Sequence, residues 1–218
     1  MLLHEHKIEV IRKARYFTRG EISESIKNVW FLIHGYGQLA EEFLGNFEII
    51  DPVKNFLVAP EALSRFYVSA KKGTVGASWM TKEDRDSEIN DYLAYLDSVY
   101  NSIIPHFGGS PVKINLLGFS QGSATAGRWA LISKAHFDNL IFWAGDLPDE
   151  DQISENTGYL KTKKFFTVIG NGDNIINKDR FKAQSAAFSK FGLNHSSLTF
   201  DGGHEINRDC LVEIINCI

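Results

Sequence analysis

The most regular feature of the sequence is a series of short apolar runs separated by longer amphipathic or polar stretches. Within each run the apolar residues follow one another without alternation, which is typical of strands that are buried on both faces of a sheet. An edge strand is expected over residues 8–18, where β-branched, aromatic and charged residues mix, and a last strand over residues 196–200. The buried strands are expected at residues 29–33, 55–60, 114–117, 140–144 and 165–169.

Helical periodicity is clearest in the stretch that follows Thr81. Apolar residues recur there at three- and four-residue steps up to Ile104, and Pro105 predicts the end of the helix. The segment Thr81-Lys-Glu-Asp84 has the spacing of a capping box, which predicts the start of the helix at this point. Further helices are expected over residues 39–50, directly after Ser120, over residues 178–191 with Gly192 as the C-cap, and from Glu205 to the C-terminus.

Two stretches lack both kinds of periodicity. Residues 61–81 contain Gly73 and Gly76 among several aromatic residues, and they predict a long irregular loop. A loop of that length in a compact domain is more often functional than idle. Residues 149–158 are acidic and polar, and they predict an irregular excursion over the surface.

The alternation of strands and helices indicates the fold class. Strands that alternate with helices form a mainly parallel sheet with helices on both faces, so the chain is expected to be an α/β protein. A chain of 218 residues can form one large domain with a full core, and we expect a single domain over residues 1–218. In such sheets the functional site forms beyond the carboxyl ends of the strands.

Gly118-Phe-Ser-Gln-Gly122 is the strongest candidate motif, because it follows a predicted buried strand and precedes a helix of small residues. G-x-S-x-G in that setting is the pattern of a nucleophile elbow, a sharp turn that presents its serine at the N-terminus of a helix. Side chains two positions to either side of the serine would clash, and Gly118 and Gly122 avoid this. The pattern alone is weak evidence, and an inert serine in a tight turn is the alternative.

A serine nucleophile needs a base, and the base needs an acid that orients it. His204 is the expected base, because it follows the last strand after two glycines. Asp173 is the expected acid, in a glycine-bracketed turn after a buried strand; a turn aspartate that bonds its own backbone is the alternative for this residue. Asp146, which also follows a strand, is the competing acid. The order serine, aspartate, histidine is the one found on α/β-hydrolase sheets.

Acyl transfer also needs two N–H groups that stabilise the oxyanion. One is expected from Gln121, directly after the nucleophile, and the other from Tyr36 in the loop His34-Gly-Tyr-Gly37. His34 itself is expected to be a structural residue of that loop. The loop lacks both G-x-G-x-x-G and a P-loop lysine pattern, so a phosphate-binding loop is not favoured.

Composition and charge narrow the function classes. A net charge of −4 without a basic cluster argues against a nucleic-acid partner. No apolar run approaches the roughly 18 residues of a membrane span, so no integral membrane segment is expected. The N-terminus is charged at once and has no signal region, and a cytoplasmic protein is therefore expected. Cys210 and Cys217 have no metal-ligand spacing and are too far apart on a helix for a disulfide, so no metal is expected.

The whole chain resembles the α/β-hydrolase superfamily, and within it the phospholipase/carboxylesterase branch that includes acyl-protein thioesterases. The resemblance extends from residue 29 to the C-terminus, and it implies Ser120, Asp173 and His204 as the catalytic triad. It also implies N–H donors at Tyr36 and Gln121, and no cofactor. It rests on four segments that occur in the family's order, namely His34-Gly-Tyr-Gly37, Gly118-Phe-Ser-Gln-Gly122, Gly170-Asn-Gly-Asp173 and Gly203-His204.

Two segments depart from the family's pattern. The first loop usually reads His-Gly-Leu-Gly-Asp, whereas Tyr36 and Gln38 replace the leucine and the aspartate here. Residues 77–85 also differ from the segment that lines the acyl groove in acyl-protein thioesterases. Trp79 and Met80 belong to this segment and are candidates to contact the acyl group, with core packing as the alternative; Phe119, next to the nucleophile, is a third candidate.

Together these features predict a serine hydrolase that cleaves a small-molecule carboxylic ester or thioester through an acyl-enzyme on Ser120. A small or medium acyl group is expected, because the chain has no long lid insertion. Lysophospholipids and protein-bound acyl groups are not distinguished by the sequence, and neither is the oligomeric state. The alternative is a small-molecule binding or sensor protein that keeps the hydrolase fold without turnover.

Overall fold

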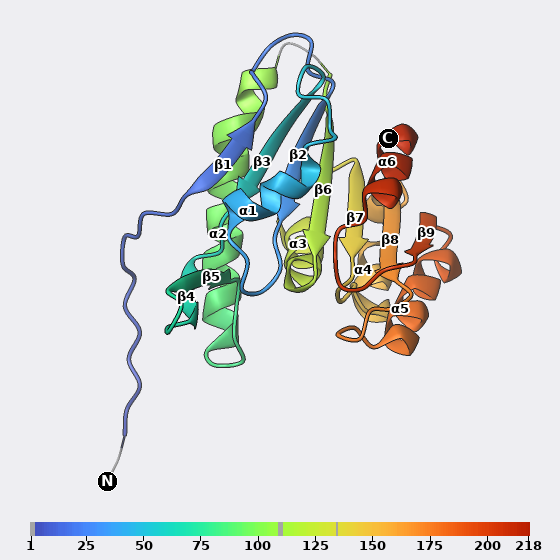
Figure 1. The fold of residues 1–218 in the computed structure, drawn as a ribbon. Helices are drawn as coiled ribbons and strands as arrows, with labels where there is room; N and C mark the ends of the chain where they lie inside the picture. Colours follow the sequence, from blue (N-terminus) through green and yellow to red (C-terminus); the bar gives the residue numbers. More distant parts are fainter. Residues whose placement is uncertain (1–2, 109–110, 134) are drawn as a thin grey trace.

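The computed structural model, which describes residues 3–108, 111–133 and 135–218, contains a central seven-stranded sheet (Figure 1). The strand order is β1-β3-β2-β6-β7-β8-β9, and only β1 runs antiparallel to its neighbour. The prediction of a mainly parallel sheet is therefore confirmed. The strands are β1 Tyr16–Arg19, β2 Asn28–Ile33, β3 Asn55–Pro60, β6 Lys113–Phe119, β7 Asn139–Trp143, β8 Lys164–Gly170 and β9 Asn194–Phe200.

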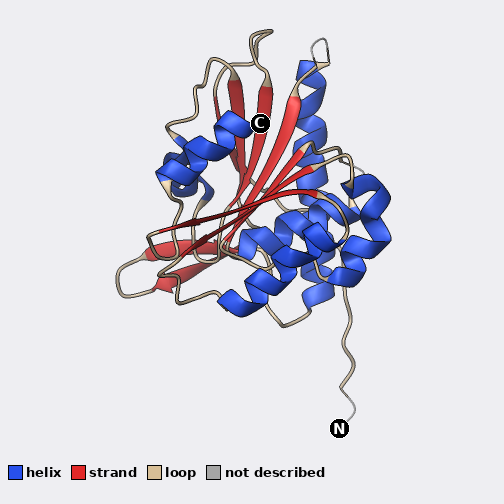
Figure 2. Ribbon diagram, turned by 90° about the vertical axis from the view of Figure 1, so that its right-hand side faces the viewer, coloured by secondary structure: helices blue, strands red, loops and turns tan. Residues whose placement is uncertain are grey.

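Helices cover both faces of this sheet, as Figures 1 and 2 show. Successive side chains of a strand point to opposite faces, so the fully apolar strands supply two cores at once. In β2, Val29 and Phe31 belong to one core, and Trp30 and Leu32 belong to the other. The first core contains residues of α2 (Arg85–Ile103), α3 (Gln121–Ile132), α4 (Glu150–Leu160) and α5 (Lys178–Lys190); the second contains residues of α1 (Ala40–Leu44), the 3-10 turn η1 (Gly45–Phe47) and α6 (Arg208–Cys217).

The prediction of an irregular loop over residues 61–81 is wrong, because these residues contain a β-hairpin. Strands β4 (Ser64–Ser69) and β5 (Thr74–Ser78) pair antiparallel around a turn in which Gly73 has a positive φ of 68°. The hairpin also joins the loop after β2, since the Gly37 N–H donates to Ala77 O at 2.8 Å and the Ala77 N–H donates to Gln38 O at 3.1 Å. The segment is thus held against the glycine-rich loop that the sequence placed at the site.

Residues 149–158 are also not an irregular excursion, since they begin α4. Asp149 caps this helix, and Asp149 and Gln152 form a reciprocal capping box. Only Ile153 and Leu160 are buried from this helix, which is why its periodicity is hard to detect in the sequence.

The ends of three other elements differ from the prediction. The long helix α2 starts at Arg85, after Asp84 in a left-handed conformation, and Thr81 bonds the Glu88 side chain instead of capping the helix. The last helix starts at Arg208, not at Glu205. The edge strand is confined to β1, and it pairs with β3 over residues 16–19 only.

Both cysteines of the chain lie on α6. Cys210 is buried in the second core and Cys217 is exposed, and both are free thiols. Over the residues that the structure describes, no helix combines the length and the apolar character needed to cross a membrane.

We expect that Trp129→Phe will lower the free energy of unfolding by about 1–3 kcal/mol, because the indole is buried and bonded to a charged partner. Trp129 is 0 % exposed, and its Nε1–H donates to the Asp97 carboxylate at 2.8 Å. Phe31 and Phe137 pack edge-on against the indole, with ring centroids 5.3 and 4.8 Å away.

Urea unfolding followed by circular dichroism measures this change. The matched control on the same helix is Ile132→Ala, because Ile132 is 62 % exposed and its truncation should change stability by less than about 0.5 kcal/mol. Equal losses in the two variants would contradict the packing argument.

Candidate active site

Ser120 occupies the sharp turn between β6 and α3. Its backbone has φ 55° and ψ −120°, a strained conformation for a residue with a side chain, and its N–H donates to Trp143 O at 2.8 Å. The turn depends on close backbone contact: a Cβ on Gly118 would lie 2.2 Å from Gly122 O, and a Cβ on Gly122 would lie 2.1 Å from Ile33 O. This is the geometry that the G-x-S-x-G pattern predicts.

Asp173 and His204 come together from the ends of two neighbouring strands, β8 and β9. The Nδ1–H of His204 donates to Asp173 Oδ2 at 2.8 Å. The other carboxylate oxygen, Oδ1, accepts the backbone N–H groups of Ile175 at 2.8 Å and Ile176 at 3.1 Å. One oxygen of Asp173 therefore bonds its own turn, and the other remains for the histidine.

Burial alone would raise the pKa of Asp173. The hydrogen bond from His204 and those from the Ile176 and Ile175 N–H groups outweigh burial, so the pKa is lowered overall. The carboxylate is therefore ionised at neutral pH, the state that orients and stabilises an imidazolium.

Backbone contacts between the two turns set this pairing. The Asn171 N–H donates to Phe200 O and the Gly172 N–H donates to Gly202 O, both at 2.8 Å. A Cβ on Gly170 would lie 2.4 Å from Gly203 O, so the two turns pack backbone against backbone. Because β8 and β9 are parallel and end opposite one another, the residues that follow them lie at the same edge of the sheet.

Asp146, the competing acid, points elsewhere. Its carboxylate is 56 % exposed and forms an ion pair with Arg180, at 3.4 Å from Nη2. The structure thus brings Asp173, and not Asp146, into contact with His204.

Ser120 and His204 are joined through the packing of Phe119. The rings of Phe119 and His204 have centroids 4.9 Å apart, and Phe119 directly precedes the serine. Within the described part of the chain, neither Ser120 Oγ nor His204 Nε2 forms a hydrogen bond, since the bond of His204 is made through Nδ1. Catalytic hydrogen bonds are often completed only when substrate is bound.

The loop after β2 leaves one backbone N–H available. The Gly35 N–H donates to Gln38 Oε1 and the Gly37 N–H to Ala77 O, whereas the Tyr36 N–H between them has no acceptor among the described residues. Gln121 is the first residue of α3, where backbone N–H groups have no partner within the helix. Gln121 directly follows Ser120, and a Cβ on Gly35 would lie 3.1 Å from Ser120 Cβ, so the segments that carry both N–H groups lie beside the turn of Ser120.

The Gln121 side chain has a role that the sequence did not reveal. Its Oε1 accepts the Trp79 N–H at 3.0 Å, and its Nε2 donates to Met80 O at 2.7 Å. This amide ties the segment after β5 to the start of α3 and so fixes the wall beside Ser120.

The three candidates for contact with the acyl group are placed differently. Trp79 is 2 % exposed; its Nε1–H donates to His34 O at 2.8 Å, and its ring packs against Tyr92. Phe119 is 4 % exposed and packs between Phe43 and His204. Trp79 and Phe119 are core residues behind the site, whereas Met80 reaches the cavity next to Ser120.

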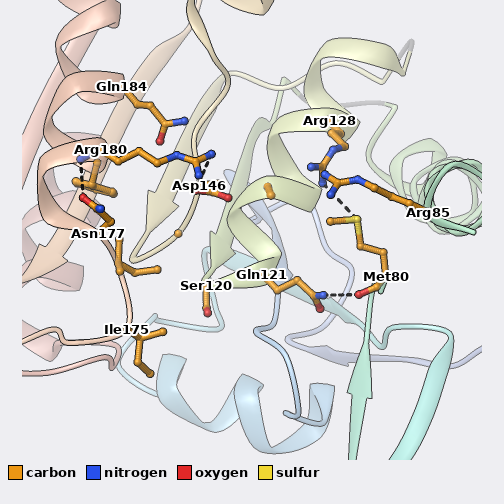
Figure 3. A pocket seen from close by; sticks show the side chains of 14 residues that line it. Met80, Arg85, Ser120, Gln121, Arg128, Asp146, Ile175, Asn177, Arg180 and Gln184 are labelled. Carbon is orange, nitrogen blue, oxygen red and sulfur yellow. Dashed lines mark hydrogen bonds and ion pairs between the residues drawn. The ribbon is translucent and has the colours of Figure 1, made fainter. Parts of the chain in front are cut away.

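This cavity, drawn in Figure 3, has a volume of about 380 Å³ and opens beside Ser120 and Gln121. Its wall combines apolar side chains with an unexpected set of polar ones. Of these polar residues, the sequence analysis named Ser120, Gln121 and, as the competing acid, Asp146, whereas the arginines, Asn177 and Gln184 were not predicted. The remaining lining residues are Met80, Arg85, Ala124, Arg128, Gly145, Asp146, Ile175, Ile176, Asn177, Arg180, Phe181 and Gln184.

His34 lies beneath the loop that carries Tyr36. It is 0 % exposed, and the Ala62 N–H donates to its Nε2 at 3.0 Å, which leaves Nδ1 to donate to Gly35 O at 2.7 Å. Burial lowers the pKa of His34 to about 4, against the smaller effects of the Gly35 carbonyl and of Glu61. The imidazole is therefore neutral at neutral pH, and its contacts within the loop agree with the structural role that the sequence analysis expected.

No described group of three or more His, Cys, Asp or Glu side chains has the arrangement of a metal site.

Comparisons with known proteins place this geometry in context. A family model described as "Serine hydrolase (FSH1)" matches residues 37–209, which is more than half of the chain. A comparison with curated proteins returned no match.

Solved structures share the fold at low sequence identity. Acyl-protein thioesterase 2 of Zea mays superposes with a TM-score of 0.71 at 17% identity, covering 94% of this chain and 97% of that one. Esterase PE8 gives a TM-score of 0.70 at 20% identity, with coverages of 94% and 98%. A carboxylesterase from Mesorhizobium loti gives 0.70 at 16% identity, with coverages of 94% and 93%. The expected α/β-hydrolase fold is confirmed.

We expect the stability advantage of native His34 to be lost as the pH falls. Its pKa is about 4 in the folded chain and 6.5 when unperturbed, so the unfolded state takes up a proton first. The contribution of neutral His34 to the free energy of unfolding is fully present above pH 6.5. It declines as the pH falls from 6.5 to 4, by up to about 3 kcal/mol in total.

Chemical unfolding at several pH values, comparing the wild type with His34→Gln, measures this effect. The difference in the free energy of unfolding should be largest above pH 6.5 and should shrink toward pH 4. His106→Gln, at an exposed histidine, is the control and should follow the wild type throughout. A difference between wild type and His34→Gln that stays constant with pH would contradict the prediction.

Proposed function

Because the chain belongs to the serine hydrolase (FSH1) family, we propose that it cleaves carboxylic esters or thioesters through an acyl-enzyme on Ser120. The observation that carries the proposal is the hydrogen bond between His204 and Asp173 at the same sheet edge as the strained turn of Ser120. The names of its structural neighbours, which include esterases and an acyl-protein thioesterase, point to the same reaction class.

In the first step, Ser120 Oγ attacks the carbonyl carbon of the substrate. The Oγ proton passes to Nε2 of His204, since Nδ1 already donates to Asp173. The Oγ–C bond forms, and the carbonyl oxygen takes the electron pair and becomes an oxyanion. The ionised Asp173 stabilises the resulting imidazolium and keeps the ring in the tautomer that presents a free Nε2.

The oxyanion is stabilised by the backbone N–H groups of Tyr36 and Gln121. Two observations support this assignment. The Tyr36 N–H has no acceptor among the residues that the structure describes, whereas its two neighbours are bonded, and Gln121 is the first residue of α3. The N-terminus of α3 adds the positive end of a helix dipole, which favours developing negative charge.

The intermediate then collapses and the C–O or C–S bond breaks. The leaving alkoxide or thiolate takes the proton from His204 Nε2, and the acyl group remains on Ser120. A water molecule then attacks the acyl carbon while His204 accepts its proton. Cleavage of the C–Oγ bond releases the acid, and the proton returns to Oγ.

The cavity beside Ser120 limits the size of the substrate. A volume of about 380 Å³, at the low end of ligand pockets, accommodates a small or medium acyl group together with part of the leaving group. Met80 contributes an apolar part of the wall. This agrees with the small or medium acyl group that the sequence predicts.

We expect a fluorophosphonate probe to label the purified protein, because such probes react with a serine that is already activated. Labelling should be lost in Ser120→Ala, and it should fall by at least about 10³-fold in His204→Ala, since the base is removed. Mass spectrometry of the labelled peptide locates the site. Ser154→Ala, an exposed serine on α4, is the matched control and should label like the wild type.

Labelling of Ser120→Ala at the wild-type rate would overturn the assignment of the nucleophile. A native protein that neither labels nor hydrolyses a panel of aryl esters and thioesters, but binds small molecules, would instead be a binding protein on a hydrolase fold. Asp173→Asn separates the role of the acid: it should slow labelling by about 10²–10⁴-fold while the wild-type fold is retained.

A further inference from the structure

The cavity beside Ser120 is cationic although the whole chain is acidic. Three arginines line it, Arg85, Arg128 and Arg180, against a single carboxylate, Asp146. The net charge of the chain is −4, so this excess of positive charge is local and does not follow from the composition. Figure 3 shows that the arginines come from different elements: α2, α3 and α5.

Within the described part of the chain, one of these three arginines forms an ion pair with a carboxylate. Arg180 forms the ion pair with Asp146, at 3.4 Å. Among the residues that the structure describes, no carboxylate lies within ion-pair distance of Arg85 or Arg128. The contacts of Arg128 Nη1 are neutral, with Tyr92 Oη at 3.5 Å and Met80 Sδ at 3.9 Å.

The two unpaired guanidinium groups act on the same place. Arg85 and Arg128 line the same cavity, and Arg128 Nη1 lies 3.5 Å from Tyr92 Oη. Burial raises the pKa of Tyr92, and the positive charges of Arg128 and Arg85 both oppose that rise. Two like charges held near one another without a counter-charge repel each other. Arg85 is also the first residue of α2, where the helix dipole disfavours a cation. Such an arrangement is stabilised when an anion binds between the groups.

Met80 extends between the two ends of the cavity: its backbone O accepts from Gln121 Nε2 at 2.7 Å, next to Ser120, and its Sδ lies 3.9 Å from Arg128 Nη1. Met80, Ile176 and Phe181 line the same cavity as Ser120, Arg85 and Arg128. The cavity therefore offers, in order, a reactive hydroxyl, an apolar wall and a cationic end. A ligand with a reactive carbonyl, a short hydrocarbon spacer and an anionic terminus matches all three.

We propose that the substrate is an ester or thioester that carries a carboxylate or phosphate a few carbon atoms from the reacting carbonyl, and that Arg85 and Arg128 bind this anion. The proposal rests on the proposed acyl transfer at Ser120. Arginine suits the task, because its planar fork donates two parallel hydrogen bonds to carboxylate or phosphate oxygens.

The test compares two substrates that differ only in the terminal group: 4-nitrophenyl hexanoate and the mono-4-nitrophenyl ester of adipic acid. Rates are corrected for spontaneous hydrolysis, and kcat/KM is measured for each. We expect kcat/KM to be at least about tenfold higher for the adipate ester, the value of one good charge-assisted hydrogen bond. The preference should decline as salt is added, because the cavity is open to solvent.

Variants assign the preference to the two arginines. Arg85→Gln and Arg128→Gln should each lower the adipate-to-hexanoate ratio of kcat/KM by about tenfold, mainly through KM. Arg128→Lys should restore part of the ratio lost in Arg128→Gln, because it returns the charge without the fork. Arg12→Gln, which removes the same charge outside the cavity, is the control and should keep the wild-type ratio.

The anion can belong to the acyl chain or to the leaving group, and a second pair of substrates separates these sources. S-hexanoyl 3-mercaptopropionate carries the carboxylate on the leaving thiol, and S-hexanoyl 3-mercaptopropanol is its neutral partner. A preference in this pair but not in the adipate pair assigns the arginines to the leaving group. A preference in the adipate pair alone assigns them to the acyl chain.

Failure of this inference is distinguishable from failure of the proposed hydrolase. If the wild type labels at Ser120 with fluorophosphonate but shows no preference in either pair of substrates, the anion site is wrong and the hydrolase stands. If labelling fails, Ser120→Ala is titrated with adipate and with hexanoate by calorimetry. Tighter binding of adipate that is lost in Ser120→Ala/Arg85→Gln supports the anion site without turnover, and equal binding overturns it.

Discussion

The close backbone contact around Ser120 is the constraint on which the site depends. The turn at the end of β6 packs against the end of β2, so that a Cβ on Gly122 would lie 2.1 Å from Ile33 O. Holding Ser120 at φ 55° costs about 1–3 kcal/mol of backbone strain, which the surrounding structure must offset. The offset comes from apolar strands that are buried on both faces and from the aromatic cluster around Trp129 on α3. The turn of Ser120 is thus held by the buried core of the molecule.

The parallel sheet extends this constraint to the other two members of the candidate triad. Strands β8 and β9 are in register over their whole length, and the turns that follow them bond through backbone groups. Asp173 and His204 meet because their strands end at the same edge, and not because they are near in sequence. Asp173 uses one oxygen to stabilise its own turn and the other to hold the imidazole, so the fold and the chemistry share one side chain.

The proposed reacting groups and the proposed substrate contacts come from different parts of the chain. The proposed reacting groups follow the strands, whose positions the core fixes. The cavity wall comes mainly from the start of α2, from α3, from the start of α5 and from the segment after β5, which the Gln121 side chain ties in place. Side chains on helix surfaces can change without disturbing the core. A shared hydrolase scaffold therefore accommodates different substrate classes, and the substrate has to be inferred from the wall of the cavity.

Local patterns in the sequence were sufficient for the buried strands and for the turn around Ser120, because uninterrupted apolar runs and paired glycines have few other structural uses. They were misleading at residues 61–81 and 149–158. Strands β4 and β5 are short and partly exposed. In α4 only two side chains are buried, so the apolar face of the helix is hardly visible in the sequence. Where few residues contact the core, the periodicity of apolar residues is weak. The pairing of the hairpin with the loop after β2 depends on tertiary contacts, which the local sequence does not show.

By itself, the sequence determined the fold class and the identity of the candidate nucleophile, because both follow from short-range hydrophobic patterning and from backbone sterics. Only the tertiary structure decided between Asp173 and Asp146, since both follow a strand and only contact with His204 separates them. It also decided that Trp79 and Phe119 pack behind the site while Met80 lines it. The convergence of Arg85 and Arg128 has no signature along the chain, because their proximity depends on how α2 and α3 pack on one face of the sheet.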